Sequence, residues 1–187
     1  MIQEIHNAIE VLNKGGIILY PTDTIWGIGC DATNEEAVKK IYQLKQRDDS
    51  KAMLVLLNNP NRLGQYVSEV PDVVWDLLEV NDKPMTIIYN GAKNLAKNLI
   101  SEDSSIGIRI VQDEFCDKLL TRFRKPLVST SANISGNPSP AIFDEIEDEI
   151  KEGVDYVVNW RQDDLSVRPA SSIIKIESNG RFQILRK

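Results

Sequence analysis

The sequence is poor in the residues that metal sites and nucleophilic catalysis most often use. It holds one histidine, His6, and two cysteines, Cys30 and Cys116, which stand far apart with no C-x-x-C pair. Zinc sites and disulfide frameworks need clustered cysteine or histidine, so neither is expected, and the predicted location is a reducing cytoplasm. Walker, G-x-G-x-x-G and H-E-x-x-H motifs are also missing. The sequence therefore predicts no metal held by protein side chains.

Long apolar runs are absent as well. No stretch of 18 apolar residues occurs, so no membrane span is expected. Glu4 and Glu10 interrupt the N-terminal segment, which argues against a signal peptide. The formal net charge is −6, and an acidic protein is a poor general ligand for nucleic acid, because phosphate contacts need clustered lysine and arginine. Weak RNA binding at a local basic cleft stays open.

What the sequence does contain is the pattern of one α/β domain. Its 187 residues suit a single domain, 1–187, and a hydrophobic content of 42% is enough for a buried core. Apolar residues recur at helical spacing from Ile2 to Leu12, and short apolar runs alternate with helical segments beyond them. The expected strands are 17–20, 52–57, 85–89, 106–111 and 126–130, then YVVNW, SSIIKI and RFQIL; the expected helices include 113–123 and short pieces in 60–80. This mixture predicts a mixed sheet with flanking helices.

Two helix starts carry sequence signatures. Thr33 and Glu36 have the spacing of a capping box, in which each side chain satisfies a free backbone donor of the other residue. Ser139 precedes Pro140, a good N-cap before a proline at the first helical position. The first signature predicts a helix from Thr33, and the second predicts an acidic helix from Ser139 to about Glu152.

The stretch PLVSTSANISGNPSP, residues 126–140, places many small polar side chains after a short apolar run. Its consecutive hydroxyls at 129–131 allow a serine nucleophile as one interpretation. A Ser-His-Asp arrangement needs a base, however, and His6 lies on the N-terminal amphipathic helix. Because α/β proteins often bind ligands at strand ends, the alternative is a loop that holds a ligand through Ser131 and Asn133.

Two other segments are candidates for ligand contacts. YPTDTIWGIGCDA, residues 20–32, offers hydroxyls, a carboxylate and glycines that let the backbone approach a ligand, although a turn-rich crossover would look the same. KQRDDSK brings Lys45, Arg47 and Lys51 together, which suits a polyanion such as a triphosphate if the preceding helix ends near Leu44. A solvated charged loop is the alternative.

Arg109 is the one charge inside the apolar strand IGIRIV. A charged side chain in such a strand must face solvent, a partner or a ligand, and strand alternation permits an outward-facing position. The sequence alone leaves these three environments open.

In this order, the segments resemble the YrdC-like family. The resemblance covers nearly the whole chain, and its motifs are YPTDTIWGIGCDA, the K-x-R of Lys45 and Arg47, the S-x-N of Ser131 and Asn133, and ASSIIKI followed by ILR. Each motif is weak alone, but the full set in order at this length is specific. The resemblance implies a short, single-domain member with a twisted mixed sheet around a concave, locally basic cleft.

The bacterial enzyme of this family is a nucleotidyltransferase, L-threonylcarbamoyladenylate synthase. The resemblance implies that L-threonine, bicarbonate or CO₂, and ATP with Mg²⁺ give threonylcarbamoyl-AMP and pyrophosphate. A threonylcarbamoyl-transfer complex would then use the product to form N6-threonylcarbamoyladenosine in tRNA. The nucleophile belongs to the substrate, so the reaction needs positioning and charge stabilisation rather than an enzyme serine.

The resemblance also assigns roles to residues. The catalytic set would be Lys45, Arg47, Ser131 and Asn133. Threonine would be held by Thr24, Arg109, Ser131 and Ser171, and the nucleotide by Lys45, Arg47, Lys51, Ser105, Asn133 and Arg186.

Two departures from the family pattern keep rival functions open. Trp26 stands where the family usually has tyrosine, and DKPMT, residues 82–86, keeps only Pro84 and Thr86 of an expected P-G-P-x-T. One rival is a non-catalytic module that binds double-stranded RNA, against which the negative net charge counts. The other is a diverged family paralogue, which the altered DKPMT favours and the intact K-x-R and S-x-N pairs oppose.

Overall fold

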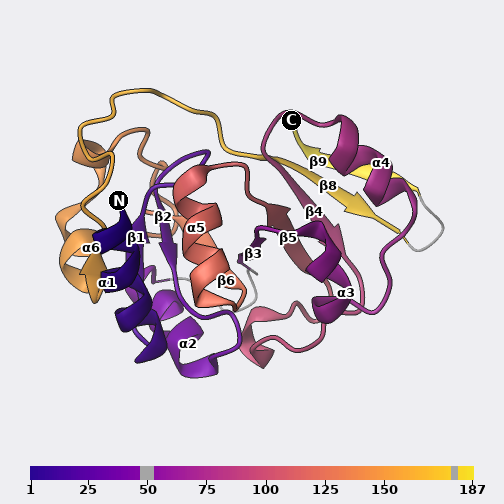
Figure 1. Cartoon of the computed structure of the whole chain (residues 1–187), viewed down its shortest axis with the longest axis horizontal. Helices are drawn as coiled ribbons and strands as arrows, with labels where there is room; N and C mark the ends of the chain where they lie inside the picture. The colour runs from indigo at the N-terminus through magenta and orange to yellow at the C-terminus, as the bar shows by residue number, and fades with distance from the viewer. Residues whose placement is uncertain (47–52, 178–180) are drawn as a thin grey trace.

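The computed structural model describes residues 1–46, 53–177 and 181–187. In this part of the chain, nine strands form one sheet in the order β7-β1-β2-β6-β3-β5-β4-β8-β9 (Figure 1). Parallel pairs join β1 to β7, β3 to β5 and β4 to β8, and the other neighbours are antiparallel. The predicted α/β class with a mixed sheet is confirmed.

The strands are β1 Ile18–Tyr20, β2 Gly27–Gly29, β3 Leu54–Leu57, β4 Met85–Tyr89, β5 Ile106–Ile110, β6 Leu127–Ser131, β7 Tyr156–Val157, β8 Ser172–Ile176 and β9 Phe182–Arg186. The helices are α1 Ile2–Asn13, α2 Glu35–Leu44, α3 Leu63–Tyr66, α4 Val73–Val80, α5 Glu114–Phe123 and α6 Asp148–Gly153, with 3₁₀ turns η1 Pro60–Arg62, η2 Lys97–Leu99 and η3 Phe143–Glu145. The expected strands are found with shifted ends, although YVVNW is a strand only at Tyr156–Val157, and β2 was not expected. None of the helices in the described ranges is long and apolar enough to cross a membrane.

Both predicted N-caps were wrong, although the helix predicted from Thr33 is present as α2 and begins two residues later. The N-cap of α2 is Asn34, whose side chain accepts a hydrogen bond from the Ala37 N–H at 3.1 Å. The Thr33 hydroxyl donates to Asp31 Oδ1 at 2.6 Å and lies one residue before the observed cap. Near Ser139, the Ala141 N–H donates to the Glu145 carboxylate at 2.7 Å, and a loop with a single 3₁₀ turn precedes α6. In both places a local side-chain hydrogen bond competes with the expected cap.

Helices pack on both faces of the sheet, which explains its continuous apolar strands. α1 and α5 lie side by side over one face (Figure 1). There, Ile5 and Leu12 of α1 and Leu119 of α5 bury their side chains against Ile18 and Leu56. A second and larger cluster fills the other face, where α2 packs. The sheet is therefore a rigid central layer for any residue that projects from its strands.

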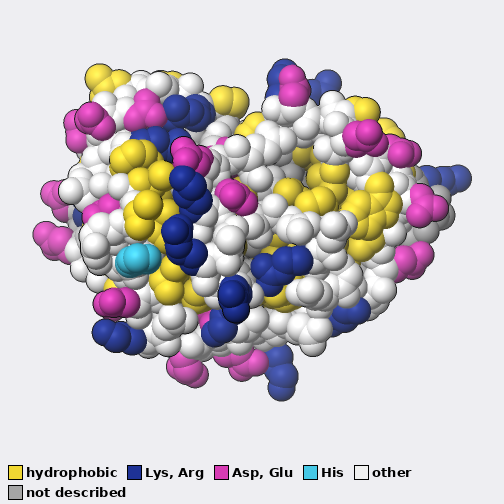
Figure 2. All heavy atoms as spheres, in the orientation of Figure 1, with side chains coloured by type: hydrophobic (Ala, Val, Ile, Leu, Met, Phe, Trp, Pro, Cys, Tyr) yellow, Lys and Arg dark blue, Asp and Glu magenta, His cyan; other side chains and the backbone are white. Residues whose placement is uncertain are grey.

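The outer surface carries charge unevenly. On the face seen in Figure 2, lysine and arginine side chains run down the middle, over α5, whereas carboxylates lie mainly toward the rim. His6 is exposed on the outer surface of α1 on this same face. This position removes the only histidine of the sequence as a base for the serines of residues 129–131.

Candidate active site

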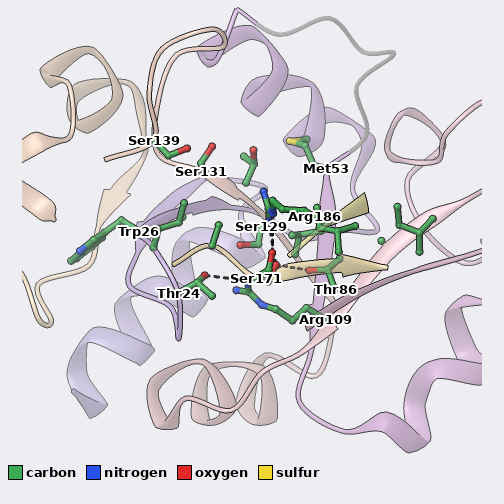
Figure 3. A pocket seen from close by; sticks show the side chains of 18 of the residues that line it. Thr24, Trp26, Met53, Thr86, Arg109, Ser129, Ser131, Ser139, Ser171 and Arg186 are labelled. Atoms are coloured by element: carbon green, nitrogen blue, oxygen red, sulfur yellow. Dashed lines mark hydrogen bonds between the residues drawn. The ribbon is translucent and has the colours of Figure 1, made fainter. Parts of the chain in front are cut away.

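A cavity of about 290 Å³ opens beside the central strands (Figure 3). Its polar lining consists mostly of hydroxyls, with two arginines, Arg109 and Arg186, and with Trp26 and Met53 at its walls. The hydroxyl side chains are Thr24, Thr86, Ser101, Ser105, Ser129, Thr130, Ser131, Ser139 and Ser171. No aspartate or glutamate lines the cavity in the described ranges. A lining that is cationic and rich in hydrogen-bonding groups suits an anionic, polar ligand.

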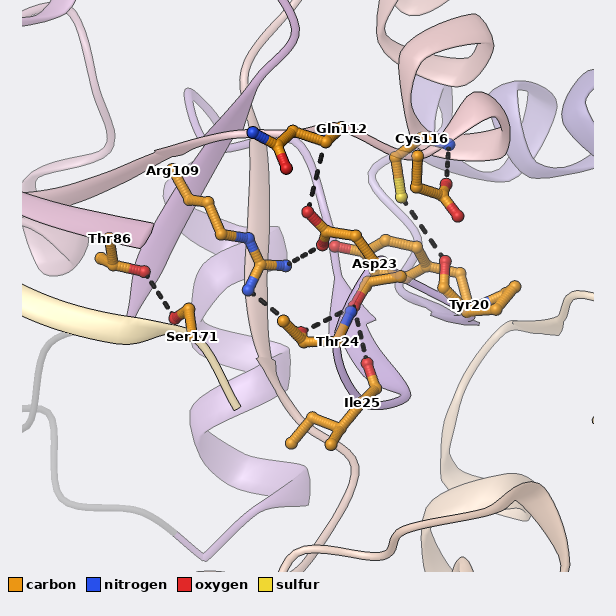
Figure 4. A network of polar contacts seen from close by, with 12 residues as sticks. Tyr20, Asp23, Thr24, Ile25, Thr86, Arg109, Gln112, Cys116 and Ser171 are labelled. Atoms are coloured by element: carbon orange, nitrogen blue, oxygen red, sulfur yellow. Dashed lines mark hydrogen bonds and ion pairs between the residues drawn. The ribbon is translucent and has the colours of Figure 1, made fainter. Parts of the chain in front are cut away.

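Arg109 lies in this cavity because of its register in the sheet. On β5 it lies opposite Thr86 of β4 and Leu56 of β3. It is only 3% exposed, so the solvent-facing alternative is wrong. Its guanidinium forms an ion pair with Asp23, with Nη2 at 3.0 Å from Oδ1, and Nη1 donates to Thr24 Oγ1 at 3.1 Å (Figure 4).

The ion pair with Asp23 fixes the position of the Arg109 guanidinium. Both side chains of the pair are almost fully buried, and the second carboxylate oxygen of Asp23 accepts from the Gln112 N–H at 3.4 Å. Arg109 Nε has no hydrogen-bond partner in the described part of the chain although it is buried. A buried donor without a partner is costly, so Arg109 is suited to receive an acceptor from a ligand.

Arg186 reaches the cavity from the last strand, β9. Its Nε donates to the Ser171 carbonyl oxygen at 2.9 Å, and the Ser171 hydroxyl lies 2.8 Å from that of Thr86. Burial, followed by the nearby charge of Arg109, lowers the pKa of Arg186. Two cations that disfavour each other in one cavity are both stabilised by an anion placed between them.

Lys45 and Asn133 lie behind the cavity wall. Lys45 follows directly after α2, is 1% exposed, and donates through Nζ to the carbonyl oxygens of Ser131 and Asn133, each at 2.5 Å. The Asn133 amide donates to the carbonyl oxygens of Ile134 and Asn137 at 2.9 and 2.8 Å. These two residues therefore shape the loop that presents Ser131.

The structure thus separates the predicted site residues into three groups. Those that line one cavity together are Thr24, Ser105, Arg109, Ser131, Ser171 and Arg186. Lys45 and Asn133 support the wall of that cavity. Arg47 and Lys51 lie outside the described residues, so the proposed polyanion site at 45–51 stays a prediction, although α2 does end at Leu44 as that interpretation requires.

Sequence reasoning did not single out Asp23 or Thr86 as site residues. Asp23 is buried by its pairing with Arg109, a residue far away in the chain. Thr86 faces the cavity because it lies opposite Arg109 in the sheet. MTIIY predicted a strand, but only the strand register shows which residues Thr86 meets.

The cavity has the wrong ligands for a resident metal ion. Within the described ranges, no three His, Cys, Asp or Glu side chains are grouped as a metal site would require. Hydroxyls and guanidinium groups line the cavity, and Asp23 is engaged by Arg109. Mg²⁺ would fit here only as a companion of substrate phosphates, which supply its oxygen ligands.

Comparisons with known proteins identify the family of the chain. A family model that covers Sua5, YciO and YrdC, described as "Telomere recombination", matches residues 10–187. The chain belongs to this family. It is 33% identical to the threonylcarbamoyl-AMP synthase of Pseudoalteromonas translucida over 177 residues, which are 93% of each chain.

Solved structures of family members share the fold. Escherichia coli YciO superimposes with a TM-score of 0.86 at 25% identity, over 100% of this chain and 90% of that one. Sua5 of P. abyssi, solved in complex with L-threonine, also gives a TM-score of 0.86, at 22% identity over 97% of this chain and 53% of that one. The second likeness supports the fold alone, because the identity is low and Sua5 is nearly twice as long.

Proposed function

We propose that this protein is an L-threonylcarbamoyladenylate synthase, which forms threonylcarbamoyl-AMP and pyrophosphate from L-threonine, bicarbonate or CO₂, and ATP. The observation that carries the proposal is a hydroxyl-lined cavity that holds two arginines, the buried Arg109 and the more exposed Arg186, in a chain homologous to such synthases over most of its length. One arginine suits the threonine carboxylate and the other suits phosphate. The product would supply a tRNA-modifying transfer complex.

The geometry suits a reaction in which the substrates provide the nucleophile. The amine of threonine adds to CO₂ and loses a proton, giving a carbamate. A carbamate oxygen then attacks the α-phosphorus of ATP, the bond from that phosphorus to the bridging oxygen breaks, and pyrophosphate leaves. Arg109, held by Asp23, would fix the threonine carboxylate, and its Nε is a free donor for it.

The remaining groups would position the nucleotide and stabilise charge on it. Ser131 and Ser105 present hydroxyls to the cavity, and Arg186 adds a cation. Lys45 would act through the backbone of residues 131–133 rather than on phosphate directly, since its ammonium is buried against those carbonyls. Arg47 and Lys51 remain the proposed phosphate contacts of the 45–51 segment.

The experiment is a measurement of pyrophosphate release from ATP in the presence of bicarbonate, with and without L-threonine, and with the product identified by mass spectrometry. Threonine-dependent release with threonylcarbamoyl-AMP present supports the proposal. Folded protein that binds ATP but releases no pyrophosphate with threonine overturns it and favours a diverged paralogue. Tight, salt-sensitive RNA binding without turnover would instead indicate an RNA-binding module.

A variant at Arg47 tests the part of the site that lies outside the described residues. Arg47→Ala should abolish adenylate formation while the circular dichroism spectrum and melting temperature stay near those of the wild type. Arg122→Ala is the matched control, because Arg122 is exposed on α5 and does not line the cavity. Activity that survives Arg47→Ala contradicts the assignment of the K-x-R pair.

A further inference from the structure

Two threonine hydroxyls lie in contact beside Arg109, but only one of them faces the cavity. Thr24 lines the cavity and is 6% exposed, whereas Thr22 is 3% exposed and lies behind it, outside the lining. Their Oγ1 atoms are 2.9 Å apart. Either hydroxyl could be the donor in this contact, so its direction must come from the other partners of the two groups.

Those partners settle the direction. A hydroxyl has one proton to donate and two lone pairs that accept. Thr22 Oγ1 lies 2.8 Å from the Ile25 carbonyl oxygen, which can only accept, so the Thr22 proton is used there. The Thr24 N–H, which can only donate, occupies one lone pair of Thr22 Oγ1 at 3.0 Å. The second lone pair must therefore accept the hydroxyl proton of Thr24.

This direction determines which hydrogen bonds the Thr24 hydroxyl can still make with a ligand. Its proton is directed to Thr22, away from the cavity. Arg109 Nη1, which can only donate, occupies one of its lone pairs at 3.1 Å (Figure 4). What Thr24 offers to a ligand is one remaining lone pair and no donor. Next to it, the buried Nε of Arg109 offers a donor and no acceptor.

We propose that Thr22 is a positioning residue that fixes the Thr24 hydroxyl as an acceptor, so that this corner of the cavity takes a hydrogen-bond donor of the substrate. The inference rests on the proposed function and deepens it. In L-threonine the donor is the β-hydroxyl or the N–H of the amine or carbamate, while the carboxylate accepts from Arg109. A ligand with an acceptor at this point would face a lone pair instead, and would bind poorly.

The chain allows a matched pair of variants at this position. Thr22→Val keeps the shape and the γ-methyl group, which lies near Gly27, but removes the hydroxyl. Thr22→Ser keeps the hydroxyl and loses the methyl group. In Thr22→Val we expect the KM for L-threonine to rise about 10-fold, with the KM for ATP unchanged, as the loss of one neutral hydrogen bond predicts. Thr22→Ser should stay within about twofold of the wild type for both substrates.

L-2-Aminobutyrate, which is threonine without its hydroxyl oxygen, identifies the donor. If Thr24 accepts from the β-hydroxyl, the wild type prefers threonine over aminobutyrate, and Thr22→Val removes that preference. If Thr24 accepts from the N–H, the KM values of both amino acids rise together in Thr22→Val. Either result supports the proposal.

Three results would overturn it: a Thr22→Val enzyme with a normal KM for threonine, a Thr22→Ser enzyme as impaired as Thr22→Val, or a parallel rise in the KM for ATP. If melting curves show that Thr22→Val does not fold, Thr22→Ala takes its place and is judged by the same three criteria. Calorimetric titration of L-threonine gives the same comparison without turnover. A wild type that binds threonine but releases no pyrophosphate would then count against the proposed function and not against the role of Thr22.

Discussion

The ammonium group of Lys45 donates to the backbone carbonyl oxygen of Asn133, and both groups are buried. The same ammonium also donates to the carbonyl oxygen of Ser131. The lysine of K-x-R and the backbone of S-x-N are therefore one structural unit, in which the residue after α2 anchors the loop after β6. Their joint presence in the sequence has a physical reason, because the ammonium of one segment binds the backbone carbonyl groups of the other.

The first prediction concerns this anchor. Lys45→Met keeps the length of the side chain but leaves the buried Asn133 carbonyl group without its donor, which costs about 1–3 kcal/mol. The Ser131 carbonyl oxygen keeps the Asn133 N–H as a donor, at 3.0 Å. We expect a lower melting temperature together with a loss of pyrophosphate release. Lys39→Met is the control, since Lys39 lies exposed on the same helix. A Lys45→Met protein with wild-type stability would contradict the anchoring role.

The second prediction concerns the buried ion pair. Asp23→Asn leaves the charge of Arg109 buried without its counterion, and the free energy of unfolding should fall by about 3 kcal/mol. Loss of orientation should also raise the KM for L-threonine more than the KM for ATP. Denaturant unfolding and steady-state kinetics check the two effects, with the exposed Asp76→Asn on α4 as the control. Equal effects on both substrates would show that Asp23 has no specific role in holding threonine.

The strands and helices could be predicted from the sequence because they depend on the local periodicity of apolar residues. MTIIY matches β4, and the apolar spacing of residues 2–12 matches α1. The helix starts were harder to predict, because the carboxylates of Asp31 and Glu145 accept hydrogen bonds from residues near the expected caps.

The contacts of the site residues could not be predicted, because their partners lie far away in the sequence. Arg109 was conspicuous in its strand, but its ion pair with Asp23 follows from the way β5 packs against the loop after β1. No rule of local spacing gives that pairing. The burial of Lys45 was missed for the same reason, since the carbonyl groups that it meets lie far away in the chain.

The third prediction concerns close packing in the sheet. A Cβ atom on Gly29 would lie 2.6 Å from the Val128 carbonyl oxygen and 2.7 Å from the Tyr20 ring. Gly29→Ala should therefore destabilise the protein by about 1–3 kcal/mol, as overpacked cores do. Gly64→Ala on α3 is the control, because nothing lies within 4 Å of its added Cβ. Thermal melts that show equal stability for the two variants would contradict this account.

The fourth prediction concerns acid pH. The pKa of Asp103 is lowered from 3.8 to about 2, first by a hydrogen bond from the Ser105 side chain and then by one from Lys175. Since the folded-state pKa lies below the ordinary value, the contribution of Asp103 to stability is complete above about pH 4 and is lost as the pH falls through about 2. The group is largely exposed, so the contribution stays below about 1 kcal/mol.

Urea midpoints of the wild type and Asp103→Asn at pH 6, 4, 3 and 2 check this sign. The wild type should be the more stable protein at pH 6, and the difference should shrink toward pH 2. Asp72→Asn, at an aspartate that makes no side-chain cap to α4, provides the control for a general change of charge. A difference that stays constant down to pH 2 would contradict the lowered pKa.

Strand β9 exposes all five of its residues, yet it supplies Arg186 to the cavity. Little apolar burial holds such an edge strand, so it is among the first parts of the sheet that we expect to open. A ligand that contacts Arg186 and Arg109 together would tie this edge to the middle of the sheet. Slower amide hydrogen exchange along β9 would then report occupancy of the cavity.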